Sequence, residues 1–240
     1  EPIVRAGARA LESGRTKYTE ATGLPELREA IAGHYRRIAG LPLDPGRVVV
    51  TSGASGALML LSALLVDPGD VWLMTDPGYP CNRHFWTVAG GVSHLVPVGP
   101  DTGFNLTPAQ LRSVVTPATR GVLFASPANP TGAVLGRRPM AALCATATEL
   151  GLYRIVDEIY QGLVYEDGAD SLATVLEVDA GAFVVNSFSK YFGMTGWRLG
   201  WIVAPAAAVS ALERLAQNLY ISPPTISQYA ALAAFDPGAI

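Results

Sequence analysis

Short apolar runs alternate with longer helical patterns along most of the chain. Seven runs rich in Val, Ile and Leu predict β-strands, and seven longer stretches predict α-helices. The predicted strands cover residues 47–51, 71–75, 93–98, 120–125, 153–157, 182–187 and 197–203. The predicted helices cover residues 25–38, 54–66, 79–89, 107–115, 137–150, 205–220 and 225–234.

This order of elements predicts the fold. Continuously apolar strands separated by helices are typical of a mostly parallel sheet covered on both faces. We therefore expect an α/β fold, a three-layer sandwich around a mostly parallel sheet of about seven strands. Such sheets bind ligands beyond the carboxyl ends of their strands. Candidate site residues follow the predicted strands there: 52–55, 76–79, 126–129, Asp157 and Ser187.

Composition narrows the class of protein. The 240 residues can form one substantial core, and with 50% hydrophobic and 15% charged residues we expect faces that meet another domain or subunit. A net charge of -3 gives no support for a nucleic-acid partner. The longest apolar run, near residues 57–66, is too short to cross a membrane. Two cysteines are too few for the disulfide framework of a secreted protein, which favours the cytoplasm. The three histidines do not have the spacing of metal ligands.

The most informative chemistry lies in Ser187-Phe188-Ser189-Lys190 and in Arg198, eight residues after the lysine. Between apolar runs, Lys190 is expected to need a polar pocket or the loss of its charge, because an unpaired buried ammonium is costly. A Schiff base with an aldehyde cofactor removes that charge. Arg198 suits a phosphate, which its planar fork can bind with two hydrogen bonds. Together they predict pyridoxal phosphate.

Two further segments fit this cofactor. Gly53-Ala54-Ser55 lies between a strand and a helix, where backbone N–H groups can bind phosphate; the alternative is an ordinary turn capped by a serine. Asp157 at a strand end would keep a pyridine nitrogen protonated, and Tyr160 would donate to the 3-oxygen of the ring. The alternative for Asp157 is a helix N-cap, and Glu158 is expected to be structural or solvated.

Six motifs in the same order make the chain resemble a fold-type I pyridoxal-phosphate enzyme of the class I/II, aspartate aminotransferase-like family. The motifs are Tyr18-Thr19 with Gly23-Leu24-Pro25-Glu26-Leu27-Arg28, Ser52-Gly53-Ala54-Ser55-Gly56-Ala57-Leu58, Asp76-Pro77-Gly78-Tyr79-Pro80, Asn129-Pro130-Thr131-Gly132, Asp157-Glu158-Ile159-Tyr160, and the block from Ser187 to Gly200. They span nearly the whole chain.

The resemblance implies roles that the residues alone leave open. It assigns phosphate binding to Ala54 and Ser55, and it places Asn129 at the 3-oxygen of the ring, near the substrate carboxylate. It stacks Tyr79 on the ring, where the alternative is core packing. It also sends Tyr18, otherwise a surface tyrosine, to the cofactor phosphate of a neighbouring subunit, which implies a homodimer with shared active sites.

The function expected from these residues is transfer of an amino group between an L-amino acid and a 2-oxo acid. Lys190 would hold the cofactor as an internal aldimine and then move the proton at the substrate α-carbon. The fold also hosts C–S lyases and decarboxylases, and a cofactor-binding sensor domain of a transcriptional regulator is a further alternative.

The resemblance also implies an organisation for the chain. Residues 1–240 resemble the cofactor-binding large domain, truncated at both ends and without the small C-terminal domain. The family takes the arginine that binds the substrate carboxylate from that small domain. We therefore expect little transamination from these residues alone, and the sequence leaves open which amino acid is used.

Overall fold

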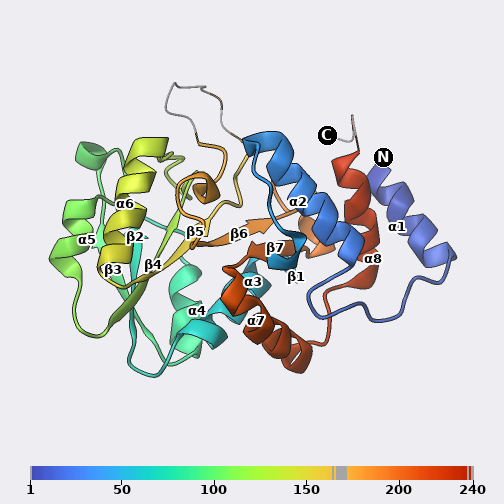
Figure 1. Ribbon diagram of the computed structural model, residues 1–240, viewed down its shortest axis with the longest axis horizontal. Coiled ribbons are helices and arrows are strands. Elements are labelled where there is room, and N and C mark those ends of the chain that lie inside the picture. The colour runs from blue at the N-terminus through green and yellow to red at the C-terminus, as the bar shows by residue number, and fades with distance from the viewer. Residues whose placement is uncertain (1, 164, 166–171, 237, 239–240) are drawn as a thin grey trace. The chain divides into compact units, whose positions relative to one another are not determined.

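The chain adopts an α/β fold built on one mixed sheet (Figure 1). The computed structural model describes residues 2–163, 165, 172–236 and 238. Seven strands are hydrogen-bonded in the order β1-β7-β6-β5-β4-β2-β3. The pairs β2–β3, β2–β4, β4–β5 and β5–β6 are parallel, and β1–β7 is antiparallel. The predicted fold class is therefore confirmed.

All seven predicted strands are present in the described part of the chain. They are β1 (Val48–Thr51), β2 (Val71–Asp76), β3 (Val92–Pro97), β4 (Thr119–Ala125), β5 (Tyr153–Asp157), β6 (Phe183–Ser187) and β7 (Gly200–Val203). The prediction was least accurate at β7, which we expected to begin at residue 197. Thr195–Trp197 instead forms a 3-10 helix, and Arg198 has a φ of 52°. A left-handed residue cannot continue an extended strand, so β7 begins after it.

The helices follow the predicted pattern, with one addition. They are α1 (Pro2–Glu12), α2 (Pro25–Ala39), α3 (Gly53–Leu65), α4 (Asn82–Val88), α5 (Pro108–Val114), α6 (Arg137–Glu149), α7 (Ala206–Leu219) and α8 (Thr225–Leu232). The sequence did not predict α1, whose buried residues are the small Gly7 and Ala10. Within the described residues, no helix combines the length and apolarity needed to cross a bilayer.

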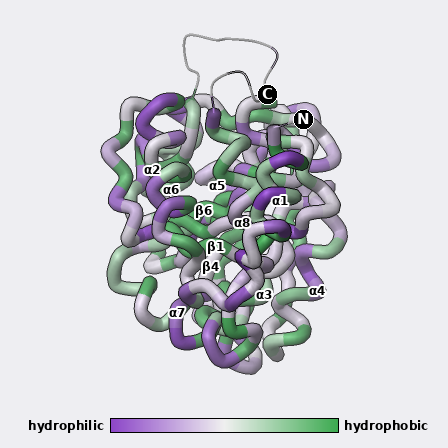
Figure 2. The backbone as a smooth tube through the Cα atoms, turned by 90° about the vertical axis from the view of Figure 1, so that its right-hand side faces the viewer, coloured by the Kyte–Doolittle hydropathy of each residue, from purple (hydrophilic) through white to green (hydrophobic). Residues whose placement is uncertain are grey.

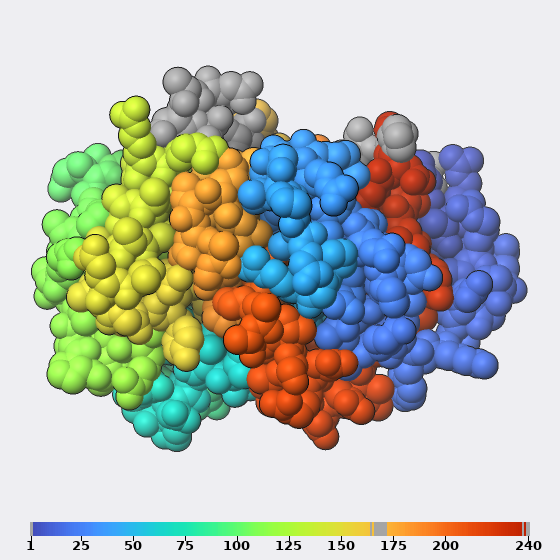
Figure 3. All heavy atoms as spheres, viewed as in Figure 1, coloured from blue at the N-terminus to red at the C-terminus, as the bar shows by residue number. Residues whose placement is uncertain are grey.

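The chain divides into two compact units. Unit 1 comprises Glu1–Leu60 and Asn186–Ile240, and its core surrounds the antiparallel pair β1 and β7, whose residues are all buried. Trp201 in β7 donates to the hydroxyl of Tyr35 in α2 at 3.1 Å, and both side chains are buried. Figure 3 shows α2 and α7, in blue and orange-red, on the face of this unit turned to the viewer. Helices α1 and α8 lie side by side (Figures 1 and 2).

Unit 2 comprises Leu61–Val185 and holds the parallel strands β2 to β5. Its core is apolar. The ring of Trp72 lies directly on Gly121 of β4, where an added Cβ would come within 2.5 Å of it. Because these strands are parallel, the loops after β2, β4 and β5 all leave from the same edge of the sheet.

Candidate active site

The residues predicted to bind phosphate lie together in unit 1. We call Gly53–Ser55, Ser187–Ser189 and Arg198 the phosphate cradle. Gly53 begins α3 with a φ of 76°, and Gly200 of β7 lies directly on it. A Cβ on Gly200 would lie 2.7 Å from the backbone oxygen of Asn186 and 2.9 Å from the backbone nitrogen of Ala54. Only glycine therefore allows β7 to approach the first turn of α3, whose N–H groups lack partners within the helix.

Arg198 adds a cation at the same point. Its left-handed backbone and a 2.9 Å bond from Nη1 to the Thr195 oxygen direct the guanidinium toward α3. A Cβ added to Gly53 would lie 2.7 Å from Nη2 of Arg198. A guanidinium beside the positive end of a helix is favourable when an anion lies between them. The geometry and charge of the cradle are therefore suited to an anion.

The hydroxyls of Ser187 and Ser189 form the third side of the cradle. Ser187 is buried, and its Oγ lies 3.1 Å from the Leu199 oxygen and 2.9 Å from Ser189 Oγ. The Ser189 N–H donates to the same Ser187 Oγ at 3.0 Å. Ser189 was not among the predicted site residues. The signal that could have identified it was the second hydroxyl in Ser-Phe-Ser-Lys.

Lys190 follows these serines in the turn after β6. Phe188 and Phe192, on either side of it, are buried, and the Met194 N–H donates to the Phe188 oxygen at 2.9 Å. Lys190 itself is exposed. The two phenylalanines occupy the core side of the turn, and the side chain of Lys190 therefore lies on its outer side. They also fix the backbone from which Lys190 extends.

The predicted ring-binding residues lie in unit 2, and we call Tyr79, Asn129, Asp157 and Tyr160 the ring cluster. Asp157 ends β5 and is 7% exposed. Its Oδ1 accepts from the Ile159 N–H at 2.9 Å. Residues 159–162 form a turn and not a helix, so this bond is not the helix N-cap that was the alternative. Burial raises the pKa of Asp157 to about 6, and the Ile159 N–H opposes that rise.

The other members of the ring cluster lie beside Asp157. The Ser126 N–H donates to the backbone carbonyl oxygen of Asp157 at 3.1 Å. This bond connects the loop that bears Asn129 to the end of β5. Asn129 Nδ2 lies 3.4 Å from the Tyr160 hydroxyl. The pKa of Tyr79 is raised, first by a hydrogen bond with Cys81, then by partial burial and by its neighbours, which include Tyr160 and Asp157.

A cavity of about 110 Å³ adjoins this cluster within unit 2. Tyr79 and Asn129 line it, together with Asp76, Asn82 and Arg83. The loops after β2 and β4 thus contribute side chains to one recess. Tyr79 remains 44% exposed, so part of this residue is open for contact.

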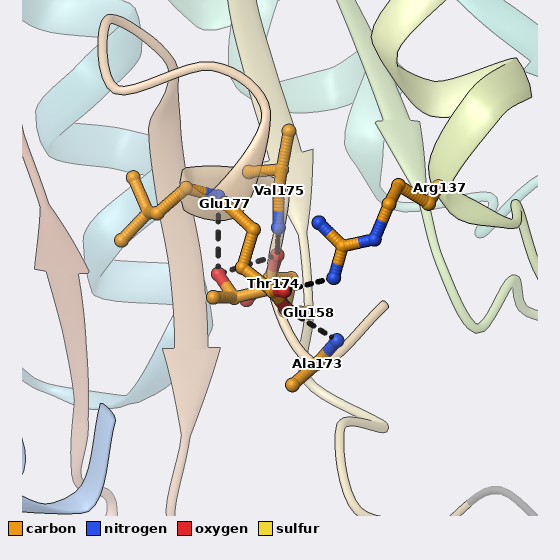
Figure 4. Close-up of polar contacts among 7 residues, drawn as sticks. Arg137, Glu158, Ala173, Thr174, Val175 and Glu177 are labelled. Carbon is orange, nitrogen blue, oxygen red and sulfur yellow. Dashed lines mark hydrogen bonds and ion pairs between the residues drawn. The ribbon is translucent and has the colours of Figure 1, made fainter. Parts of the chain in front are cut away.

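Glu158 points into different surroundings (Figure 4). It is 2% exposed, and its Oε1 accepts from the Thr174 hydroxyl at 3.0 Å and from the Val175 N–H at 2.6 Å. Glu177, in the same segment, accepts from the Ala173 N–H and pairs with Arg137. The structural alternative for Glu158 is confirmed and the solvated one is wrong. Burial raises the pKa of Glu158 to about 8.

Tyr18 lies in unit 1, between α1 and α2, and is 77% exposed. The residues on both sides of it are bound to α8, Lys17 through its backbone and Thr19 through its hydroxyl. The Thr225 hydroxyl donates to the Lys17 oxygen at 2.8 Å, and Gln228 Nε2 donates to Thr19 Oγ1 at 3.0 Å. The predicted site residues therefore form two groups, one in each unit, with Tyr18 on an exposed segment of unit 1.

Comparison with known proteins identifies the class. The family model for aminotransferase class I and II matches residues 1–239, so the chain belongs to that family. It is 43% identical to the valine–pyruvate aminotransferase of Mycobacterium tuberculosis over 239 residues, which are 100% of this chain and 61% of that protein. It is 38% identical to the aspartate/prephenate aminotransferase of Thermus thermophilus, over 98% of this chain and 60% of that protein.

Solved structures agree with the fold. The crystal structure of an aminotransferase from Mycobacterium tuberculosis superposes with a TM-score of 0.94 at 42% identity, covering 99% of this chain and 65% of that one. Thermus thermophilus aspartate aminotransferase with maleate gives a TM-score of 0.91 at 36% identity, covering 98% of this chain and 61% of that one. The chain thus spans about three fifths of the length of the curated relatives it matches.

Members of this family use pyridoxal 5'-phosphate, and the cradle fits its phosphate group. The donors are of the right kind: backbone N–H groups at a helix start, two hydroxyls and a guanidinium. The two glycines at the cradle allow Arg198 and β7 to approach the first turn of α3, where a Cβ would collide with them. The residues present are therefore chemically and sterically suited to this cofactor.

The buried Glu158 should make stability depend on pH. Its pKa is about 8 in the folded chain against an ordinary 4.5. Between these values the folded protein holds a proton that the unfolded chain has released. The free energy of unfolding should therefore fall as pH rises, by about 1 kcal/mol per pH unit for this group. Glu158→Gln keeps an acceptor for Val175 and removes the titration, so denaturant unfolding should show a flatter profile from pH 6 to 8.

A matched control is Glu149→Gln, since that side chain is 61% exposed. In Glu149→Gln the free energy of unfolding should change with pH by the same slope as in the wild type. Parallel profiles for the wild type and Glu158→Gln between pH 6 and 8 would show that Glu158 ionises in its ordinary range.

Gly200→Ala should disturb the cradle, because the new Cβ meets backbone atoms at 2.7–2.9 Å. Overpacking of this kind costs about 1–3 kcal/mol in unfolding free energy. Gly196→Ala is the control, because an added Cβ there meets nothing within 4 Å. Thermal unfolding of the two variants should separate them, and equal melting temperatures would contradict the close approach of β7 to α3.

Proposed function

We propose that this chain is the cofactor-binding large domain of a pyridoxal-phosphate-dependent aminotransferase. The reaction proposed is transfer of an amino group between an L-amino acid and a 2-oxo acid. The observation that carries the proposal is the phosphate cradle, with Lys190 three residues after Ser187, in a chain that matches the aminotransferase family over residues 1–239. The names of the relatives, valine–pyruvate and aspartate/prephenate aminotransferases, support the reaction class.

Phosphate binding is assigned to unit 1. Arg198 would contribute its fork, Ser187 its hydroxyl, and Ala54 and Ser55 their N–H groups. The proposal is supported by the convergence of Arg198, Gly53 and Gly200 at the first turn of α3. A phosphate dianion there would neutralise both the guanidinium and the positive helix end.

The ring cluster of unit 2 is assigned to the pyridine ring. Asp157 would hold a proton on the ring nitrogen, and a cation there would offset the desolvation that raises the pKa of Asp157. Tyr160 and Asn129, whose polar atoms lie 3.4 Å apart, would donate to the 3-oxygen. Tyr79 would stack on the ring with its exposed face. When bound, pyridoxal phosphate supplies an electron sink for the electrons released at the substrate α-carbon.

Lys190 is assigned two tasks. Its Nζ would first attach the cofactor covalently, and after the substrate amine replaces it, the same Nζ would remove the proton from the substrate α-carbon. A lysine in a turn fixed by two buried phenylalanines suits both tasks, since its long side chain moves while its backbone does not.

We further propose a homodimer in which Tyr18 reaches the phosphate of the partner subunit. The exposure of Tyr18 on a held segment supports this. We also infer a reducing compartment, the cytoplasm, because Cys81 and Cys144 are both free thiols.

Borohydride reduction tests the central assignment. In the full-length protein, reduction followed by peptide mapping should place the pyridoxyl label on Lys190. Lys190→Ala should abolish multiple turnovers, because it removes both the attachment point and the base. Lys190→Arg keeps the charge without the nucleophile and should be equally inactive.

The internal comparison is Lys17, the other lysine in this sequence. A label on Lys17 with none on Lys190 would sink the assignment. So would sustained turnover of an amino acid and a 2-oxo acid by Lys190→Ala.

Arg198→Ala tests the phosphate assignment. A charge-assisted hydrogen bond contributes about 1.5–3 kcal/mol, so cofactor affinity should fall roughly 10- to 150-fold. Arg198→Lys should recover only part of it, because an ammonium lacks the fork. Arg214→Ala in α7, an exposed site, should bind cofactor as the wild type does. Unchanged affinity in Arg198→Ala, measured by equilibrium titration, would refute the role.

A further inference from the structure

A buried amide in α8 holds the segment that carries Tyr18. Gln228 has 0% of its surface exposed. Its Oε1 accepts from the Leu24 N–H at 2.7 Å, and its Nε2 donates to Thr19 Oγ1 at 3.0 Å and to the Pro223 oxygen at 3.1 Å. This one side chain therefore connects both ends of residues 19–24 to α8.

The chemistry of these partners fixes the orientation of the amide. The Leu24 N–H can only donate, so it must face the oxygen of the side chain. The Pro223 carbonyl can only accept, so it must face the nitrogen. Neither an apolar side chain nor a carboxylate satisfies both at once, because the first bonds to neither and the second puts an oxygen against the Pro223 carbonyl.

Other contacts restrict the same segment. The Thr225 hydroxyl, also in α8, donates to the Lys17 oxygen at 2.8 Å. The Val50 N–H of β1 donates to the Thr22 oxygen at 2.9 Å. At Gly23 an added Cβ would come within 2.5 Å of Val50 and 3.1 Å of Gln228 Oε1, so the backbone is packed against both. Both neighbours of Tyr18 are thus bound to α8 while its own side chain is 77% exposed.

We propose that Gln228, with Thr225, is a positioning residue that presents Tyr18 in one conformation to the cofactor phosphate of a partner subunit. The inference rests on the proposed function, which gives Tyr18 its ligand. A loop left mobile would lose conformational freedom on binding, and that loss would weaken the contact. The buried amide removes this cost in advance, because residues 19–24 are already ordered.

The test uses the full-length protein and two readouts. Gln228→Met keeps the length of the side chain and removes its three hydrogen bonds. Thr225→Val removes the hydrogen bond to the Lys17 backbone. This bond is exposed, so its loss should disturb folding less than the substitution of the buried Gln228. Hydrogen–deuterium exchange should quicken in residues 17–24 of both variants. Cofactor affinity should fall roughly 10-fold in Tyr18→Phe and in Gln228→Met. The affinity should fall no further in the double variant that combines Tyr18→Phe and Gln228→Met, because both substitutions act through Tyr18.

Tyr35→Phe is the control, since it leaves the buried Trp201 N–H without its partner. Tyr35→Phe should lower global stability. The hydrogen–deuterium exchange of residues 17–24 and the cofactor affinity should stay as in the wild type. Unchanged exchange of residues 17–24 in both α8 variants overturns the inference, as does a double variant whose loss is the product of the two single losses. Tyr18→Phe with wild-type affinity also overturns it. Only the Tyr18→Phe outcome touches the proposed function, and there only the role of Tyr18. The proposed reaction is tested separately, by the label on Lys190 and by the turnover of Lys190→Ala.

Discussion

The geometry of the cradle depends on one contact in unit 1, between the guanidinium of Arg198 and the positive N-terminal end of α3. The first turn of α3 presents unpaired N–H groups, and Nη2 of Arg198 approaches within 2.7 Å of the position a Cβ on Gly53 would take. Arg198 reaches this place through a left-handed backbone, which a non-glycine residue adopts rarely and at some cost. Such an arrangement is stabilised when an anion occupies it. The geometry and charge of this part of the fold therefore suit an anion, which supports the phosphate site proposed above.

The neighbouring carboxyl groups of Asp157 and Glu158 show how one strand end can serve two purposes. Both are buried, and burial raises the pKa of each, to about 6 and about 8. Glu158 is therefore the group that keeps its proton at neutral pH, and Asp157 is left as the carboxylate. Two adjacent negative charges in a poorly solvated site would repel each other. A neutral Glu158 holds the segment at Thr174 and Val175 and leaves the charge of Asp157 for a cation.

The fold was predictable because its signals are local. Apolar strands, helix periods and turn residues each span a few positions, and these set six of the seven strands to within one residue. The motifs likewise located the cradle and the ring cluster. Helix α1 was missed although its apolar and polar residues alternate with a helical period; its buried residues are the small Gly7 and Ala10. The exposure of Lys190 was not predicted, because it depends on Phe188 and Phe192 facing the core, which the sequence does not show.

The residues that hold the site were beyond prediction for a different reason. Gln228 bonds to Leu24 across 204 positions and Glu158 bonds to Val175 across 17, so neither partner marks the other in the sequence. Yet each reactive side chain depends on such a neighbour. Phe188 and Phe192 fix the turn of Lys190, Ser126 ties the loop of Asn129 to the end of β5, and Gln228 holds the segment of Tyr18. In the function proposed above, exposed groups such as Lys190 and Tyr18 take part in the chemistry, and their buried neighbours determine where these groups lie.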